Sequence, residues 1–299
     1  MMEQKKKVLF VATVVKTHIN TFHLPFLKMF KEYGWEVHVA AKNDFVDEPC
    51  VIPNCDRHFD IDFARSPFSK SNIKAYKQLK QIIETNHYDI IHCHTPVAGV
   101  LTRLAARTAK GTTVIYTAHG FHFYQGAPLI NWLVYYPVER VCGKFTDKLI
   151  TVNQEDYHRA NSWRLRNNGK IYYVPGIGVD LEEIQNISIN KVQKKKEIGI
   201  SNDVKVLLSV GELNKNKNHE IIIRVLSKLT NKNFIYLICG NGELKEYLKN
   251  LAKELGVSDK VKFLGYRKDV LEIYKIADLF LFPSKREGLP CSLIEAMAC

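Results

Sequence analysis

The sequence predicts an α/β chain made of two parallel-sheet halves. Short β-branched and aromatic runs alternate with amphipathic segments along the whole chain, which is the rhythm of βαβ units. The chain has 299 residues, of which 46% are hydrophobic and 25% charged, so it can bury two cores. A polar stretch at 181–203 interrupts the alternation. We therefore expect two Rossmann-like halves facing each other, joined by a polar linker.

The first half, residues 1–180, is expected to form one complete sheet. Its apolar runs have the length and the β-branched content of buried parallel strands. The predicted strands span 8–15, 36–41, 89–94, 113–117, 149–153 and 171–174. The amphipathic segments between them predict helices at 22–33, 73–83, 97–108 and 129–141.

The second half, residues 204–299, repeats the alternation with fewer strands. Strands are predicted at 204–210, 234–239, 261–264 and 279–282, and helices at 220–229, 244–255, 270–276 and from about Pro290 onward. Doubly wound domains commonly carry five or six strands. Four strands therefore predict that this domain is truncated, with its C-terminal part missing.

The formal net charge of +12 predicts an anionic partner, which composition alone leaves open among nucleic acid, a nucleotide and an acidic membrane. The sequence shows neither a recognition-helix motif nor an aromatic RNA-binding platform, so nucleic acid is not expected. The seven scattered cysteines indicate a reducing compartment. The apolar run 8–15 meets Lys16 and His18 without a small-residue cleavage site, so we interpret it as a buried strand. The chain is expected to be cytoplasmic.

Two segments are candidates for peripheral contact with an anionic membrane at the inner face of the cell membrane. Lysines recur at helical spacing at positions 70, 74, 77 and 80, and residues 129–141 form an aromatic-rich amphipathic stretch with Trp132, Tyr135 and Tyr136. A solvated helix face and an ordinary core helix are the respective alternatives. No apolar stretch reaches the roughly 20 residues that span a bilayer.

The segment around Glu287 and Glu295 carries the strongest functional signal. A predicted strand ends near Phe282, Glu287 lies in the following turn, and Glu295 lies early in the next helix. Ligands of open parallel sheets bind beyond the carboxyl ends of the strands. Carboxylates there can accept hydrogen bonds from the vicinal hydroxyls of a sugar, and amides at a helix N-terminus can bind phosphate. The alternative is that Ser292 and Glu295 form a capping box and Glu287 is a solvated charge.

The stretch Phe282–Ala298 resembles the Glu-x7-Glu signature of retaining glycosyltransferases of family four, which adopt the GT-B fold. The resemblance extends over nearly the whole chain and is closest to bacterial enzymes of exopolysaccharide and capsule synthesis. Six further segments carry it: Asp89–Pro96, Tyr116–Tyr124, Val174–Asp180, Ser209–Leu213, Ile238–Glu243 and Phe263–Val270.

The resemblance implies a role for each candidate site residue. His119 and Glu287 would contact the transferred sugar and are the expected catalytic residues, and Lys217 would stabilise the departing diphosphate. Glu295 would bind the ribose hydroxyls. The full expected donor-binding set is Lys217, Gly240, Gly242, Arg267, Leu289, Pro290, Cys291, Ser292 and Glu295.

The chain departs from the family pattern at two places. Glu212 stands where the family usually has an arginine that faces the donor diphosphate together with a lysine. Either Lys215, Lys285 or Arg286 supplies this second positive charge beside Lys217, or the donor binds more weakly than in typical members. The loop after the first strand lacks the usual glycines, and its His18 and Asn20 are assigned loosely to the cleft.

No bound metal or cofactor is expected. His92 and His94 alternate along a predicted strand and so lie on one face, but further ligands with suitable spacing are lacking nearby. The family generally needs no metal. These two histidines are therefore interpreted as structural or acceptor-side residues.

The resemblance implies transfer of a hexose or N-acetylhexosamine from a nucleoside diphosphate, UDP before others, to a glycan. The acceptor would be polyprenyl-diphosphate-linked, and front-side attack would retain the anomeric configuration. Three alternatives stay open: a UDP-sugar epimerase of similar fold, a basic nucleic-acid-binding protein, and an inactive truncated fragment.

Overall fold

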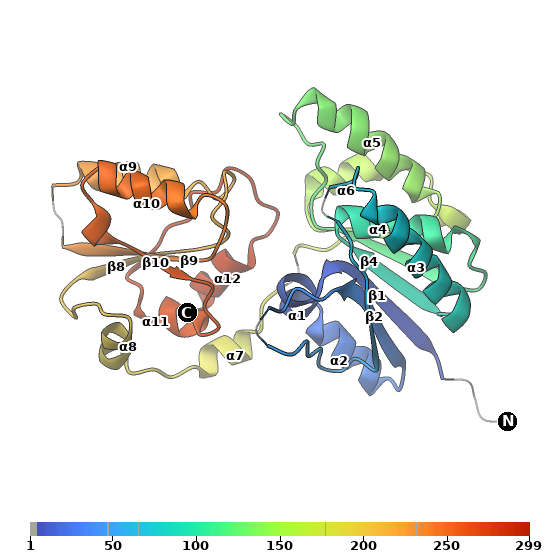
Figure 1. Cartoon of the computed structure of the whole chain (residues 1–299), viewed down its shortest axis with the longest axis horizontal. Coiled ribbons are helices and arrows are strands. Elements are labelled where there is room, and N and C mark those ends of the chain that lie inside the picture. Colours follow the sequence, from blue (N-terminus) through green and yellow to red (C-terminus); the bar gives the residue numbers. More distant parts are fainter. Residues whose placement is uncertain (1–4, 47, 65, 177, 231–232) are drawn as a thin grey trace. The chain divides into compact units, whose positions relative to one another are not determined.

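The computed structural model describes residues 5–46, 48–64, 66–176, 178–230 and 233–299 (Figure 1). They form two compact units, Met1–Ile177 and Gly178–Cys299, which we call unit 1 and unit 2. Each unit is a parallel sheet with helices on both faces. The predicted α/β class with two Rossmann-like halves is confirmed. The division falls inside the predicted passage 174–180, of which position 177 lies outside the described residues.

Unit 1 contains a seven-stranded parallel sheet in the order β3-β2-β1-β4-β5-β6-β7. Its strands are β1 (Lys7–Val14), β2 (Glu36–Lys42), β3 (Arg57–Asp60), β4 (Ile90–His94), β5 (Thr113–Ala118), β6 (Lys148–Thr151) and β7 (Lys170–Tyr173). Its α-helices are α1 (Asn20–Phe22), α2 (Leu24–Glu32), α3 (Ser71–Asn86), α4 (Pro96–Ala105), α5 (Leu129–Gly143) and α6 (Gln154–Ala160). A π-helix, η1 (Val15–Ile19), and two 3₁₀ turns, η2 (Ala106–Thr108) and η3 (Arg166–Asn168), complete it.

The alternation of side chains along β1 separates two apolar layers. Leu9 and Val11 pack with α3 and α4, while Val8 and Phe10 face Leu27 of α2. Because a strand points successive side chains to opposite faces, this pattern requires helices on both sides of the sheet. Figure 1 shows α3 and α4 on one face and α2 on the other.

Helix α5 buries its aromatic side chains and exposes its aliphatic ones. Trp132, Tyr135 and Tyr136, which the sequence offered as membrane-facing, pack instead against the core of unit 1. Their spacing of three and four residues places them on one helix face. The exposed apolar side chains are Leu129, Ile130, Leu133, Val138 and Val141. No helix among the described residues is long and apolar enough to cross a membrane.

Unit 2 contains a four-stranded parallel sheet in the order β10-β9-β8-β11. Its strands are β8 (Lys205–Val210), β9 (Phe234–Cys239), β10 (Val261–Gly265) and β11 (Leu279–Phe280). Its helices are α7 (Leu181–Asn186), α8 (Lys191–Glu197), α9 (His219–Lys228), α10 (Lys245–Glu254), α11 (Val270–Ile276) and α12 (Cys291–Ala298), with a 3₁₀ turn η4 (Ser258–Lys260). Strand β9 sends Tyr236 and Ile238 toward α9 and α10, and Leu237 and Cys239 toward α11.

The predicted linker at 181–203 belongs to unit 2 and is largely helical, which corrects the sequence interpretation. Lys194 of α8 is buried, and its ammonium lies 2.6 Å from Asp269 and 2.5 Å from Glu272 of α11. Ile184 and Ile198 are also buried. The ion pairs of the buried Lys194 and the apolar contact of Ile198 together attach α8 to the unit.

A buried ion pair joins α4 to α5 beneath the sheet of unit 1. The Arg103 guanidinium lies 2.9 Å from the Glu139 carboxylate and 3.8 Å from the centre of the Tyr116 ring. The Tyr116 hydroxyl donates to Glu139 at 3.3 Å. A Cβ at Gly99 would lie 2.6 Å from the Tyr116 ring, so only glycine leaves room for that ring. Three elements therefore depend on one arginine–carboxylate contact.

Replacing Glu139 by alanine is expected to destabilise unit 1 by about 3–5 kcal/mol, because the Arg103 charge loses its buried partner. The double variant Arg103→Met/Glu139→Leu should recover most of that loss, since no charge is then left buried. Urea unfolding followed by tryptophan fluorescence measures unit 1 alone, because Trp35, Trp132 and Trp163 all lie in it.

The matched control is Glu84→Ala, which removes an exposed carboxylate 3.6 Å from Lys80 and should cost under about 1 kcal/mol. If Glu139→Ala and Glu84→Ala lowered the free energy of unfolding equally, the buried pair would stabilise unit 1 no more than an exposed one.

Candidate functional site

The loops that follow β8 and β9 pack backbone against backbone at the carboxyl edge of the unit 2 sheet. The Gly211 amide donates to the Cys239 carbonyl at 2.9 Å, and the Leu213 amide donates to the Asn241 carbonyl at 3.0 Å. A Cβ on Gly240 would lie 1.9 Å from the Gly211 oxygen. The predicted site residues Gly240 and Gly242 are thus required by the approach of the two loops.

Lys217 and Glu287 meet at this edge although 70 positions separate them. Their charged atoms lie 2.8 Å apart, and both side chains are about one fifth exposed. The Lys217 stem runs along Gly211, where a Cβ would approach Lys217 Cε to 3.1 Å. The end of β8 therefore positions the lysine, and the loop after β11 brings the glutamate to it.

Asn216 fastens the two loops that carry this pair. Its side-chain amide donates to the Arg286 carbonyl at 2.8 Å and to the Glu287 carboxylate at 3.3 Å. Its own carbonyl accepts from the Lys285 amide at 2.8 Å. The polar run 214–218 is thus an ordered partner of the segment 285–287.

Glu295 lies on α12 and accepts a hydrogen bond from Tyr274 of α11 at 3.0 Å. Burial raises the pKa of Glu295, and the Tyr274 hydrogen bond opposes that rise. The capping-box alternative does not hold, since the N-cap of α12 is Pro290 and no side chain caps the helix. One carboxylate oxygen of Glu295, Oε2, thus accepts the hydrogen bond from Tyr274.

The other predicted donor-binding residues are placed as follows. Pro290 precedes α12, its carbonyl accepts from the Leu293 amide at 3.1 Å, and Leu289 before it is exposed. Cys291 and Ser292 form the first turn of α12, where amides lack partners within the helix. The Cys291 thiol lies 3.9 Å from the Gly178 carbonyl oxygen.

Arg267 lies in a separate ionic network. It donates to Asp269 through two nitrogens, at 2.7 and 2.5 Å, and Asp269 also pairs with Lys194. The Arg267 hydrogen bond is the largest influence that lowers the pKa of Asp269 to about 2. This guanidinium is therefore already paired with a carboxylate through two hydrogen bonds.

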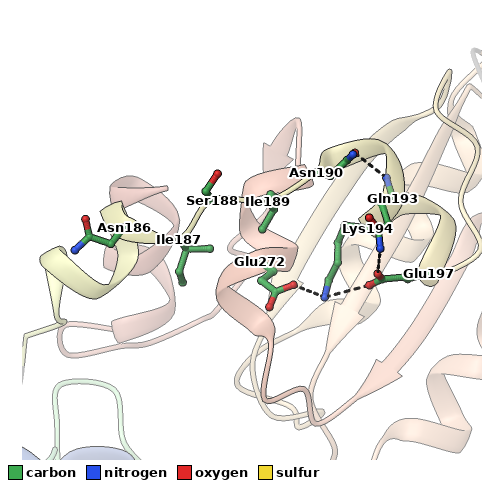
Figure 2. A pocket seen from close by; sticks show the side chains of 9 residues that line it. All are labelled: Asn186, Ile187, Ser188, Ile189, Asn190, Gln193, Lys194, Glu197 and Glu272. Carbon is green, nitrogen blue, oxygen red and sulfur yellow. Dashed lines mark hydrogen bonds and ion pairs between the residues drawn. The ribbon is translucent and has the colours of Figure 1, made fainter.

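A hollow of about 490 Å³ lies beside the same network, and none of the predicted site residues lines it. Figure 2 shows Lys194 bonded to Glu272 and Glu197 on its wall. Two carboxylates, Glu197 and Glu272, line this hollow against the single charge of Lys194, and this excess of negative charge disfavours a diphosphate.

Five histidines gather at the carboxyl edge of the unit 1 sheet, and we call His18, His23, His92, His94 and His119 the histidine cluster. His94 ends β4, and His119 follows the neighbouring strand β5. A ring nitrogen of His119 lies 3.3 Å from one of His94. His18 stands 5.1 Å from His119 between ring centres. The predicted residues His18 and His119 are thus brought together.

Burial keeps these imidazoles neutral. It lowers the pKa of His18 and His92 to about 3, of His23 to about 2 and of His119 to about 4. The pKa of His94 is also lowered, first by burial and then by the other rings. Asn20, the other predicted residue of this loop, donates to the Val51 carbonyl at 2.9 Å and so ties the loop down.

Sequence reasoning missed Asn216, Tyr274 and His23. Asn216 and Tyr274 act through partners 70 and 21 positions away, which no local pattern reveals. His23 had a usable signal, because the segments after β1, β4 and β5 all carry histidine and adjacent parallel strands end at one edge.

Two family models match the chain. The model described as "Glycosyl transferase 4-like" matches residues 7–153, and the one described as "Glycosyl transferases group 1" matches residues 190–299. The first lies within unit 1 and the second within unit 2.

Individual proteins agree with these models. The chain is 44% identical over 298 residues to EpsD of Bacillus subtilis (strain 168), a protein named as a glycosyltransferase, covering 98% of this chain and 76% of EpsD. It is 34% identical over 235 residues to the UDP-Gal:α-D-GlcNAc-diphosphoundecaprenol α-1,3-galactosyltransferase of Escherichia coli, covering 77% of this chain and 59% of that enzyme.

Among solved structures, the fold matches HepE of Anabaena in complex with UDP and glucose. The TM-score is 0.75 at 21% identity, covering 98% of this chain and 78% of HepE.

The close approach of the two loops can be tested by comparing two glycine substitutions. Both Gly240 and Gly256 have positive φ, at 145° and 65°, but a Cβ at Gly256 meets nothing within 4 Å. Gly256→Ala should cost roughly 1–2 kcal/mol from backbone strain alone. Gly240→Ala should cost more, at roughly 4 kcal/mol, because the Gly211 carbonyl must move.

The measurement is hydrogen exchange of the β8 and β9 amides, which reports on unit 2. Equal protection in the two variants would contradict a packing role for Gly240.

Proposed function

Because the chain belongs to the glycosyltransferase group 1 family, we propose that it transfers a hexose or N-acetylhexosamine from a nucleoside diphosphate sugar, UDP before others, to a lipid-linked glycan with retained anomeric configuration. The observation that carries the proposal is the Lys217–Glu287 pair at the carboxyl edge of β8. A lysine there meets the diphosphate, and a carboxylate beside it meets the hydroxyls of the sugar. Bacterial exopolysaccharide or capsule synthesis is the expected setting.

Lys217 stabilises the charge that grows on the departing diphosphate. Without a donor its ammonium is neutralised by Glu287, so binding exchanges one anionic partner for another. The exchange frees the Glu287 carboxylate to accept from sugar hydroxyls. Asn216 keeps the Glu287 loop in place while Lys217 changes partner, because it also holds the Arg286 carbonyl.

Glu295 accepts hydrogen bonds from the ribose hydroxyls, and Tyr274 is its positioning residue. The amides at the start of α12, in Cys291 and Ser292, offer further donors to phosphate oxygens. In unit 1, His119 contacts the transferred sugar near its reacting carbon. Its neutral imidazole can donate to or accept from a hydroxyl. In this proposal no metal ion contacts the donor.

A lipid-linked acceptor is favoured by two observations. The Escherichia coli relative is named for a diphosphoundecaprenol substrate. In this chain α5 exposes Leu129, Ile130 and Leu133, with relative exposures of 74%, 61% and 65%, and two exposed basic residues, Arg140 and Lys144, lie at its C-terminal end. A helix that exposes aliphatic side chains and also carries exposed basic residues suits an anionic bilayer surface.

Calorimetry with UDP and UDP-sugars tests the donor site. Lys217→Gln should weaken UDP binding by roughly 10- to 100-fold, the worth of a charge-assisted hydrogen bond. Glu295→Ala should also weaken it, and the fold should survive because the Tyr274 hydroxyl still has the Ser292 carbonyl at 3.0 Å as an acceptor.

Lys249→Gln is the control, since this exposed lysine of α10 also pairs with a glutamate at 2.8 Å and should leave UDP binding unchanged. Unaltered affinity in both site variants would refute the donor site. Conversion of a UDP-sugar to its epimer by the protein alone would replace transfer by epimerisation.

Co-sedimentation with vesicles tests the membrane face. The chain should bind vesicles rich in phosphatidylglycerol, and less so at high salt. Ile130→Asp/Leu133→Asp should abolish binding, whereas Val192→Asp, at an exposed valine of unit 2, should not. Undiminished binding of the double variant would exclude α5 as the contact.

A further inference from the structure

Four members of the histidine cluster present ring nitrogens to one another. Each of His18, His23, His94 and His119 offers one nitrogen, and these four atoms all lie within 4.8 Å of one another. The rings come from different parts of the chain: η1, the turn before α2, the end of β4 and the residue after β5. Folding therefore assembles the group, and no local sequence motif does.

Several ring nitrogens of these histidines are buried without a partner among the described residues. They are His18 Nε2, both ring nitrogens of His23, and His94 Nε2. His23 and His94 are each only 2% exposed. Buried polar atoms in folded proteins are nearly always hydrogen-bonded, so a group of unpaired ones requires an explanation.

His38 shows how this chain satisfies a structural histidine. It is equally buried, yet Tyr88 lies 2.8 Å from its Nδ1 and Glu36 lies 2.7 Å from its Nε2. Within the described ranges no carboxylate is hydrogen-bonded to a ring of the histidine cluster, and His92 has a hydroxyl partner, Thr117, at 2.8 Å. Ordinary core packing therefore explains His38 but leaves the cluster unexplained.

We propose that His18, His23, His94 and His119 bind one divalent transition-metal ion, with zinc as the first candidate. Neutral imidazole nitrogens are preferred ligands of zinc, copper and nickel. A tetrahedral zinc site with nitrogens at about 2.0–2.1 Å places its ligands roughly 3.4 Å from one another. His94 Nδ1 and His119 Nε2 are already 3.3 Å apart.

The local backbone fits a site of this kind. His18 lies in the π-helix η1, a rare conformation that is frequent at functional sites. Thr95, directly after His94, has a φ of 62°, which is costly for a β-branched residue. Thr95 is held there by Thr13, whose hydroxyl oxygen lies 2.8 Å from that of Thr95. The ends of β1 and β4 are thereby fixed around His94.

The proposal departs from the expectation that no metal is bound, and it goes beyond the transfer reaction. The ion joins the segment after β1 to the ends of β4 and β5. A histidine that ligates through one ring nitrogen carries a hydrogen on the other. Where the proposed function also holds, the ion makes the second nitrogen of His119 a hydrogen-bond donor toward the sugar.

The test is a cobalt titration of the full chain, purified without a polyhistidine tag and stripped with a chelator. One equivalent of Co²⁺ per chain should produce the intense visible absorption of a tetrahedral site, and Zn²⁺ should displace it. His94→Gln and His18→Gln should each weaken binding by more than the roughly 10- to 100-fold that loss of an outer-shell partner causes. His38→Gln, a buried histidine of the same unit, should retain full binding.

Far-UV circular dichroism and tryptophan fluorescence establish that each variant is folded. His18 is half-buried, in contrast to the buried His94, so His18→Gln remains informative if His94→Gln does not fold. Absence of the cobalt band in the folded chain, its retention in folded His18→Gln, or binding of inorganic phosphate in place of cobalt would overturn the proposal. None of these readouts depends on UDP binding or sugar transfer.

Discussion

All-parallel strand pairing is the constraint on which both units depend. In unit 1, β4 pairs with β1 and β5, and in unit 2, β8 pairs with β9 and β11, always in parallel. Every strand of a sheet therefore ends at the same edge, and the residues that follow the strands meet there. This alone brings His94 to His119, and Lys217 to Glu287. The Gly211–Gly240 approach then holds two loops at the edge of unit 2, and the buried Arg103–Glu139 pair joins α4 to α5 in unit 1.

Most of the fold could be predicted because buried parallel strands appear as continuous apolar runs. The strand β3 (Arg57–Asp60) was missed because it is short, polar and at the sheet edge, where one side of its backbone has no partner strand. The polar composition of 181–203 predicts a linker, whereas the structure has α7 and α8 there. The attachment of α8 involves the ion pairs of Lys194 with Asp269 and Glu272, which lie far along the sequence and which the local pattern does not reveal.

The candidate site could be predicted only where strand ends and local motifs coincide. Glu287, Glu295 and Lys217 satisfy that condition. Gly240 and Gly242 were proposed as ligand contacts, and the structure gives them a packing role through the Gly211 and Leu213 backbone. Asn216 and Tyr274 could not be predicted, since each becomes meaningful only through a distant partner. Arg267 was expected to meet a donor, but Asp269 binds it, two positions along the same chain segment.

The two units treat charge in opposite ways at equivalent edges. Unit 2 places lysine and carboxylates together, so its edge can exchange an internal anion for an external one at little electrostatic cost. Unit 1 places imidazoles together, and burial holds them neutral with nitrogen lone pairs available. A neutral imidazole lacks the positive charge that attracts an anion, and its lone pair can bind a metal cation. The carboxyl edge of the unit 2 sheet thus suits a diphosphate, and the same edge of the unit 1 sheet suits a metal ion. The two units share a fold, so this difference comes from the side chains at the ends of β1, β4 and β5.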